Sequence, residues 1–138
     1  MSSAEDERKS PPGMLPTMAK LRSRFRRRDW NGIEALLDCD RVWTFDRPIT
    51  VDEFATTLDE LFRDAVDLDL LISGMRFEGA SGDNRRDSFR CCVMWGETGS
   101  WKEHEFEFDL HVGSKLNSEG EWRVSHLGLT YMQEGALP

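Results

Sequence analysis

Hydrophobic residues in the first half of the chain recur with the period of an α-helix. A first helix is predicted after Thr17, which follows Pro16 in a capping position, and its apolar face consists of Met18, Leu21 and Phe25. Asp29 is placed to cap a second helix, whose apolar face consists of Trp30, Ile33 and Leu37. The chain therefore starts with two short amphipathic helices that need a common core.

The next predicted elements are a short strand over residues 41–45 and a third helix. The strand is rich in β-formers and ends at Asp46-Arg47-Pro48. Thr50 and Glu53 form a capping box, with Ile49 and Phe54 as the matching hydrophobic staple. One face of this third helix is lined by Phe54, Leu58, Leu61, Phe62 and Ala65.

The second half of the chain changes to a period of two, which is typical of strands. Strands are predicted over residues 67–78, 86–96, 101–112 and 121–132, and the short links between them favour antiparallel neighbours. If residues 97–100 form a symmetric turn, Phe89 lies opposite Phe108 and Arg90 opposite Glu107.

The two faces of these strands differ in polarity. Phe106, Phe108, Leu110 and Val112 would face the core, and the alternating acidic residues would face the other side. In one register of the last strand, Trp122, Val124 and His126 share the phenylalanine face, whereas a slip of one residue puts Leu127 there instead of His126. Large apolar groups on both sides of this strand favour a homodimer formed through the sheet.

Length and composition indicate a single globular domain. The chain has 138 residues, of which 38% are hydrophobic and 32% charged. We interpret residues 1–14 as a disordered tail, residues 15–134 as the domain and residues 135–138 as a C-terminal tail. The absence of a long apolar run and of a leader argues against a membrane protein, and three cysteines without a disulfide or metal pattern favour the cytoplasm.

Charge is distributed unevenly along the chain. The net charge is −8, yet six of the 18 basic residues fall within residues 20–28. The acidic remainder argues against a nucleic-acid-binding surface, because such a surface needs cations facing the phosphates. We interpret the basic stretch as the C-terminal end of the first helix, with binding of an acidic partner or of nucleic acid as the alternatives.

The order of these elements resembles the nuclear-transport-factor-2-like (NTF2-like, cystatin-like) superfamily. Residues 36–45 with 51–54 resemble the corresponding stretch of SnoaL-like polyketide cyclases and ketosteroid-isomerase-like relatives, and residues 120–126 resemble the last strand common in this superfamily. The resemblance covers residues 15–132. It implies an α+β cone, in which three N-terminal helices pack in a curved mixed or antiparallel sheet and leave a pocket between them.

The resemblance implies that a functional site would consist of side chains able to reach this pocket. His126 or His104 would act as a general base with Asp40 as partner, in isomerase, cyclase or dehydratase chemistry that needs no cofactor or metal. A small apolar or aromatic ligand would contact Trp30, Trp43, Trp95, Phe106, Phe108, Trp122 and Val124.

Three alternatives stay open. In the alternative interpretations, each histidine is a strand residue with a satisfied hydrogen bond, each tryptophan fills the core, and the whole chain is a non-catalytic association domain. The only tyrosine is Tyr131, near the chain end, which argues against a ketosteroid-isomerase mechanism. The acids over residues 103–109 lie on one strand and do not converge on an ion. Motifs for phosphate loops, serine hydrolases and zinc proteases are missing from the sequence.

Overall fold

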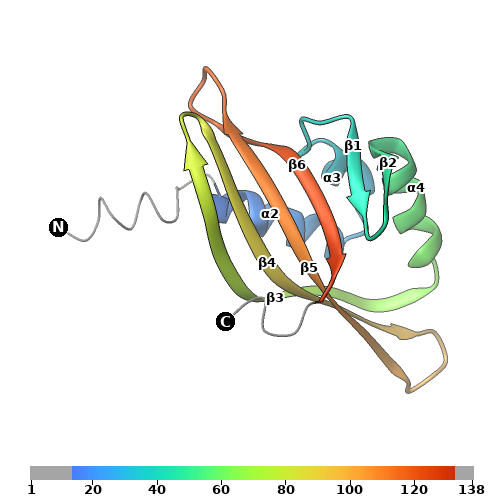
Figure 1. Ribbon diagram of the computed structural model, residues 1–138. Coiled ribbons are helices and arrows are strands. Elements are labelled where there is room, and N and C mark those ends of the chain that lie inside the picture. The colour runs from blue at the N-terminus through green and yellow to red at the C-terminus, as the bar shows by residue number, and fades with distance from the viewer. Residues whose placement is uncertain (1–13, 133–138) are drawn as a thin grey trace.

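The computed structural model describes residues 14–132 and arranges six strands and three helices of this part of the chain in two layers (Figure 1). The helices are α2 (Met14–Arg26), α3 (Trp30–Glu34) and α4 (Val51–Leu61). The strands are β1 (Arg41–Thr44), β2 (Arg47–Thr50), β3 (Ala65–Ser81), β4 (Asn84–Glu97), β5 (Glu103–Leu116) and β6 (Trp122–Tyr131). Their order in the sheet is β2-β1-β6-β5-β4-β3, and within it only β1 and β6 run parallel.

The core lies between the helices and the sheet face that they cover, called the inner face below. In Figure 1 the four long strands curve across the front, α2 and α3 lie behind them, and α4 lies at the right beside β1 and β2. Because alternate strand residues point to opposite faces, each long strand contributes a row of buried apolar side chains. These rows include Leu68 and Leu70 on β3, Phe89, Cys91 and Val93 on β4, and Phe108, Leu110 and Val112 on β5.

The local capping signals are confirmed. The Thr50 side chain accepts a hydrogen bond from the Glu53 amide at 3.1 Å at the start of α4, and Asp29 accepts from the Gly32 amide at 2.9 Å at the start of α3. Helix α2 differs from its prediction, since it begins at Met14 rather than after Thr17. Pro16 is tolerated because its missing N–H falls in the first turn.

Two features of the sheet depart from the predicted pattern. Residues 47–50, assigned to a turn and a cap, form the edge strand β2 against β1. The turn between β4 and β5 is longer than expected, so Arg90 faces Asp109 rather than Glu107, and Phe89 faces Leu110 rather than Phe108. A shift of two residues leaves every side chain on its predicted face.

A bulge in β6 decides which side chains of this strand face inward. Gly113 pairs with His126 and the next residue, Ser114, pairs with Val124, so Ser125 is the extra residue. Val124 and Leu127 are consequently both buried on the inner face, and His126 is exposed on the opposite, outer face. The register that put His126 on the phenylalanine face is therefore wrong, because strict alternation does not hold across a bulge.

Apart from Met14, the residues predicted as tails lie outside the described part of the chain. Met14 itself is the first residue of α2, so the helix extends into the segment assigned to the tail. Within residues 14–132, no helix combines the length and the apolar character needed to cross a membrane.

Candidate functional site

An apolar cavity of about 160 Å³ lies between α2, α4 and the inner face of the sheet. It is partly open to the surface, and every described residue that lines it has a hydrocarbon or aromatic side chain. The lining consists of Leu21, Phe25, Ile33, Phe45, Phe54, Leu58, Leu61, Phe62, Leu70, Val93, Phe106, Phe108, Leu110, Leu127 and Leu129. Such a cavity can bind an apolar group but offers no hydrogen-bonding side chain to orient a polar one.

Aromatic side chains form one edge of this cavity. The Phe45 ring lies 4.6 Å from that of Tyr131 and 5.7 Å from that of Phe106, measured between ring centroids. Phe106 and Tyr131 are both exposed to solvent. Phe45 has a φ of +57°, a left-handed conformation that is unfavourable for a residue with a β-carbon. The turn between β1 and β2 holds the ring of Phe45 over the cavity in this conformation.

A second cluster of aromatic side chains packs around Phe62, which also lines the cavity. The Phe62 ring lies 5.6 Å from Phe25, 6.4 Å from Trp30 and 5.3 Å from Trp95. The contacts with Phe25 and Trp95 are edge-to-face, the arrangement that aromatic pairs favour. Phe62 thus connects the helices to the sheet and also lines the cavity.

The seven aromatic and apolar residues predicted to contact a ligand are only partly brought together. Phe106 and Phe108 line the cavity, whereas Trp30 and Trp95 lie one shell further out, against Phe62.

The remaining three of the seven lie elsewhere. Trp43 is half exposed and pairs with Gly128 on the outer face. Val124 is buried beside Leu37, and Trp122, at the first residue of β6, is half-buried.

The structure does not bring the three predicted catalytic residues together. His104 stacks on Trp95 at 5.3 Å, and its Nε2 lies 2.8 Å from Glu97 Oε1, but it does not line the cavity. His126 is on the outer face, and Asp40 is an exposed residue whose backbone carbonyl accepts the Val51 amide. An imidazole–carboxylate pair aimed at the cavity is therefore not formed by these residues.

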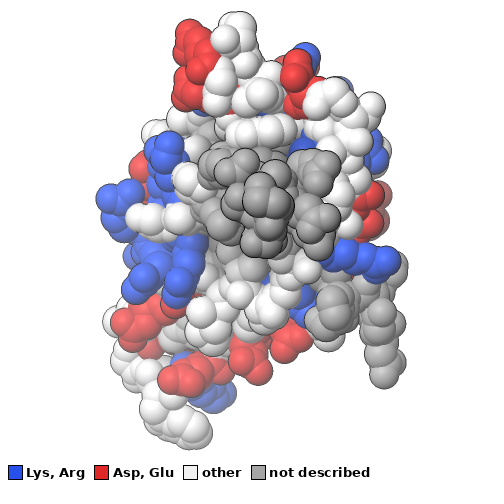
Figure 2. Space-filling model, turned by 90° about the vertical axis from the view of Figure 1, so that its left-hand side faces the viewer, with Lys and Arg blue, Asp and Glu red and all other residues white. Residues whose placement is uncertain are grey.

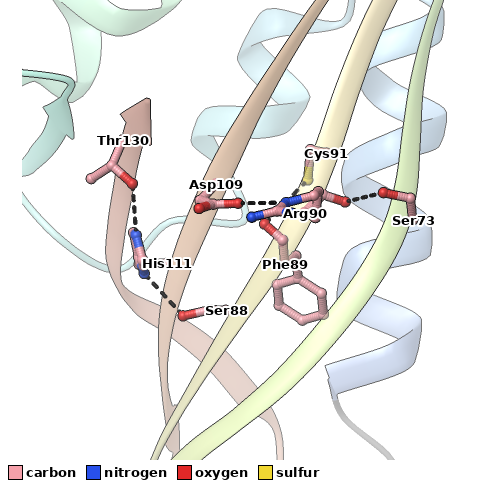
Figure 3. Close-up of polar contacts among 8 residues, drawn as sticks. All are labelled: Ser73, Ser88, Phe89, Arg90, Cys91, Asp109, His111 and Thr130. Atoms are coloured by element: carbon pink, nitrogen blue, oxygen red, sulfur yellow. Dashed lines mark hydrogen bonds and ion pairs between the residues drawn. The ribbon is translucent and has the colours of Figure 1, made fainter. Parts of the chain in front are cut away.

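The outer face of the sheet carries hydrogen-bonded polar side chains, among them Asp109 and His111 from the polar row predicted for this face of β5 (Figure 3). His111 lies between two hydroxyl groups, with Nδ1 2.9 Å from Ser88 Oγ and Nε2 2.9 Å from Thr130 Oγ1. Beside it, Arg90 Nε donates to Asp109 at 3.2 Å. The serine and histidine do not form a hydrolase triad, because the third group is a hydroxyl and Ser88 is buried.

A fully buried ion pair lies on the inner face of β4. Arg85 donates from Nε and Nη2 to the two carboxylate oxygens of Asp87, at 2.8 and 3.0 Å. The Arg85 guanidinium also stacks over the Phe77 ring at 4.5 Å. This pair was not predicted, because charged residues at the start of a strand are usually solvated.

Comparison with solved structures identifies the architecture. A protein from Novosphingobium aromaticivorans assigned as a scytalone dehydratase superposes with a TM-score of 0.74 at 12% identity, over 96% of this chain and 87% of that one. A protein from Streptomyces avermitilis assigned as a dehydratase of the NTF2-like family superposes with a TM-score of 0.69 at 8% identity, over 87% of this chain and 94% of that one. The fold is that of the NTF2-like proteins. The α+β cone predicted from the resemblance is confirmed.

Another solved structure of similar shape has been assigned a different role. A protein from Exiguobacterium sibiricum assigned as a Ca/calmodulin-dependent kinase II association domain superposes with a TM-score of 0.68 at 11% identity, over 89% of this chain and 93% of that one. No family model matches the chain, and no curated protein matches it. At these identities the likeness establishes the fold alone.

The three thiols of this chain are not activated. Burial raises the pKa of the Cys91 thiol to about 12, and it also raises the pKa values of Cys39 and Cys92. Nucleophilic cysteines need a lowered pKa, so none of the three fits that role. Among the described residues, no cluster of three or more histidine, cysteine or acidic side chains is placed to hold a metal ion.

We expect His126 to make the stability of the fold depend on pH. Burial, the charge of Arg86 and the nearby His111 lower the pKa of His126 below its ordinary value of 6.5, and Glu78 lines the same hollow. A lowered pKa means that the unfolded chain binds the proton more readily, so this contribution is present above about pH 6.5 and is lost as the pH falls. Urea unfolding should show a flatter pH profile for His126→Gln between about pH 7 and pH 5. An unchanged profile would contradict this assignment.

Proposed function

We propose that this chain binds a small apolar molecule, or an apolar group of a larger one, in the cavity of the cone. The observation that supports this most directly is the lining, in which leucine, isoleucine, valine and phenylalanine surround the space on all described sides. Transfer of an apolar ligand from water into such a site is favourable in proportion to the area buried. The ligand would be recognised by shape and by aromatic contacts.

The cavity volume limits the size of the group that fits. The cavity has about 160 Å³. An apolar protein cavity of about 150 Å³ accommodates one benzene molecule and otherwise stays dry. A single aromatic ring or a short branched hydrocarbon therefore matches the space, and the remainder of a larger ligand would extend outward because the cavity is partly open to the surface.

The energetics favour an occupant. Apolar side chains around unfilled space lack packing contacts on that side. A ligand that fills the space restores the lost contacts, which supports a binding role for the cavity.

Catalysis is not part of this proposal. Acid–base chemistry needs an ionisable group within hydrogen-bond reach of the substrate. The predicted groups His126, His104 and Asp40 lie outside the cavity lining. The dehydratase assignments among the similar structures belong to those proteins.

We expect benzene-sized ligands to raise the melting temperature of the protein. At a ligand concentration 100 times the Kd, a ligand specific to the folded state adds about 2.7 kcal/mol. At about 3 °C per kcal/mol for a chain of this size, Tm rises by about 8 °C. The measurement is a thermal-shift titration with benzene, toluene, indole and naphthalene. Tryptophan fluorescence gives a second readout, since Trp30 and Trp95 contact Phe62 in the cavity wall.

A pair of leucine substitutions provides the control. Leu129→Trp fills the cavity and should abolish the ligand-induced shift, whereas Leu116→Trp alters a half-buried leucine outside the lining and should preserve it. If ligands raise the Tm of Leu129→Trp as much as that of the wild type, they bind elsewhere. If no compound of this series shifts the wild-type Tm, the proposed binding is refuted for this ligand class.

Association with another protein is a second candidate function. The observation that favours it is the tip of the β4–β5 hairpin, where the indole of Trp101 is 91% exposed. Large exposed aromatic side chains are enriched at protein interfaces.

A further inference from the structure

A basic groove lies between the C-terminal end of α2 and the start of β3. It is lined by four arginines, Arg22, Arg26, Arg27 and Arg28, and by residues 65–68 at the start of β3, which include the acidic Asp67. In Figure 2 basic side chains gather along one side of the molecule, and acidic side chains gather below them. This groove is called the arginine groove below.

The arginines of this groove differ in whether they contact an acidic side chain of the fold. Arg22 and Arg26 both contact the Asp69 carboxylate, at 3.2–3.3 Å and 3.4 Å. Burial alone would raise the pKa of Asp69. The contacts with the two arginines and the hydrogen bond from the Leu70 amide outweigh burial and lower this pKa. Among the described residues, no acidic side chain pairs with Arg27 or Arg28.

Arg28 occupies a position where glycine is usual. The Asp29 amide donates to the Arg24 carbonyl at 2.8 Å and the Arg28 amide to the Phe25 carbonyl at 3.1 Å, which is the Schellman pattern of a helix C-terminus. Its left-handed residue is Arg28, with a φ of +56°. Because a β-carbon is unfavourable in this conformation, an arginine here points to a use for its charge.

A protruding arm carries the opposite charge. We define the arm as residues 97–107, the end of the β4–β5 hairpin, which extends from the lower right of the molecule in Figure 1. β6 ends at Tyr131, near Phe108, so the arm continues beyond it. The arm carries the exposed tip residue Trp101, one exposed cation, Lys102, and four exposed acidic residues, Glu97, Glu103, Glu105 and Glu107.

We propose that the arm of a second copy of this chain docks in the arginine groove. The acidic side chains of the arm match the guanidinium groups of Arg27 and Arg28, and the exposed indole of Trp101 can stack on a guanidinium. Both surfaces lie close together on one molecule, because Val66 in the groove pairs with Gly96 at the base of the arm. A two-fold axis can therefore make both contacts at once and close a dimer. This arrangement differs from a dimer through the outer face of the sheet.

Sedimentation equilibrium of the full chain tests the association first. We expect a species of twice the chain mass at about 50 mM NaCl and dissociation at about 500 mM, since surface charges are screened at high salt. A dimer held by the apolar side chains of the sheet would not dissociate with salt. A monomer at all protein and salt concentrations, or a dimer insensitive to salt, would overturn the proposal.

Charge reversal identifies the surfaces. Arg27→Glu/Arg28→Glu and, separately, Glu103→Arg/Glu105→Arg should each weaken dimerisation by about tenfold or more, and an equimolar mixture of the two variants should regain it. Trp101→Ala should also weaken it. Matched controls are Arg41→Glu/Arg47→Glu and Trp43→Ala, which alter exposed residues elsewhere and should leave the dimer intact. Failure of the mixture to associate would show that these two surfaces do not meet.

Arg28→Gly separates association from folding. Glycine relieves the left-handed backbone, so we expect Tm to rise by about 3 °C at high salt, where the chain is monomeric. The same variant should dimerise more weakly at low salt, because it lacks the charge. A rise in Tm with an unchanged dimer would show that Arg28 does not take part. Dimerisation that survives every substitution, together with binding of polyphosphate in the groove, would assign the groove to a different partner.

Discussion

We expect replacement of Asp87 by alanine to lower the stability of the fold by about 3–5 kcal/mol, because it removes the carboxylate that balances the buried charge of Arg85. Arg85 is 1% exposed and Asp87 is likewise buried, so water cannot replace the lost carboxylate. The pair is bidentate, with both donor–acceptor distances at 3.0 Å or below. In urea unfolding, at an m-value of about 2 kcal/mol/M, the midpoint should fall by about 2 M.

The surface pair Arg76–Glu78 gives a matched control on the neighbouring strand. Its nitrogen–oxygen distance is 3.9 Å and both side chains are about half exposed. Glu78→Ala should therefore cost no more than about 1 kcal/mol. The double variant Arg85→Met/Asp87→Leu should be more stable than Asp87→Ala, since apolar side chains of similar size often replace a buried pair well. If Asp87→Ala and Glu78→Ala lower the free energy of unfolding by the same amount, the buried pair does not stabilise the fold in this way.

Local signals in the sequence predicted the elements that depend on neighbouring residues. The caps at Asp29 and Thr50 are confirmed because a capping hydrogen bond reaches only three residues along the chain. The inward face of β5 is confirmed because alternation within one strand decides it, and Phe108, Leu110 and Val112 are buried as predicted. The row of acids on the opposite face contributes Asp109, which contacts Arg90 on β4.

Features that depend on how strands meet were not predictable in this way. The bulge at Ser125 exists only in the pairing of β5 with β6, and it alone decides that Leu127 rather than His126 faces the cavity. Gly113 permits this pairing, since a β-carbon there would lie 2.9 Å from that of His126. β2 is similar, because its four residues contain Pro48 and become a strand only beside β1.

The candidate site shows the same division. Phe106 and Phe108 were predicted from alternation and line the cavity, whereas Phe45 reaches it through a left-handed turn that no periodicity indicates. The predicted tryptophans are large enough to dominate a core, and Trp30 and Trp95 do so by supporting Phe62 rather than by lining the space. The composition of a pocket wall thus depends on the tertiary positions of a few side chains.

We expect Phe62→Ala to have a comparably large effect on stability, with a separate effect on binding. Phe62 is 8% exposed and packs on Phe25, Trp30 and Trp95, and truncation of a buried phenylalanine costs about 3–5 kcal/mol. Trp43→Ala, at a half-exposed tryptophan outside this cluster, should cost about 1 kcal/mol. Equal midpoints for the two variants in urea would contradict the central position of Phe62.

The second effect links the aromatic cluster to the proposed ligand. Because the Phe62 ring is part of the cavity wall, its removal enlarges the cavity on the side of Trp30 and Trp95. Naphthalene should then raise the Tm of Phe62→Ala by more than benzene does. In the wild type, whose cavity of about 160 Å³ matches the smaller ring, benzene should give the larger rise in Tm. Thermal-shift titrations of both proteins with both compounds measure this directly. If benzene gives the larger rise in Tm in both proteins, Phe62 does not determine the size of ligand that the cavity accepts, even if the variant is destabilised as expected.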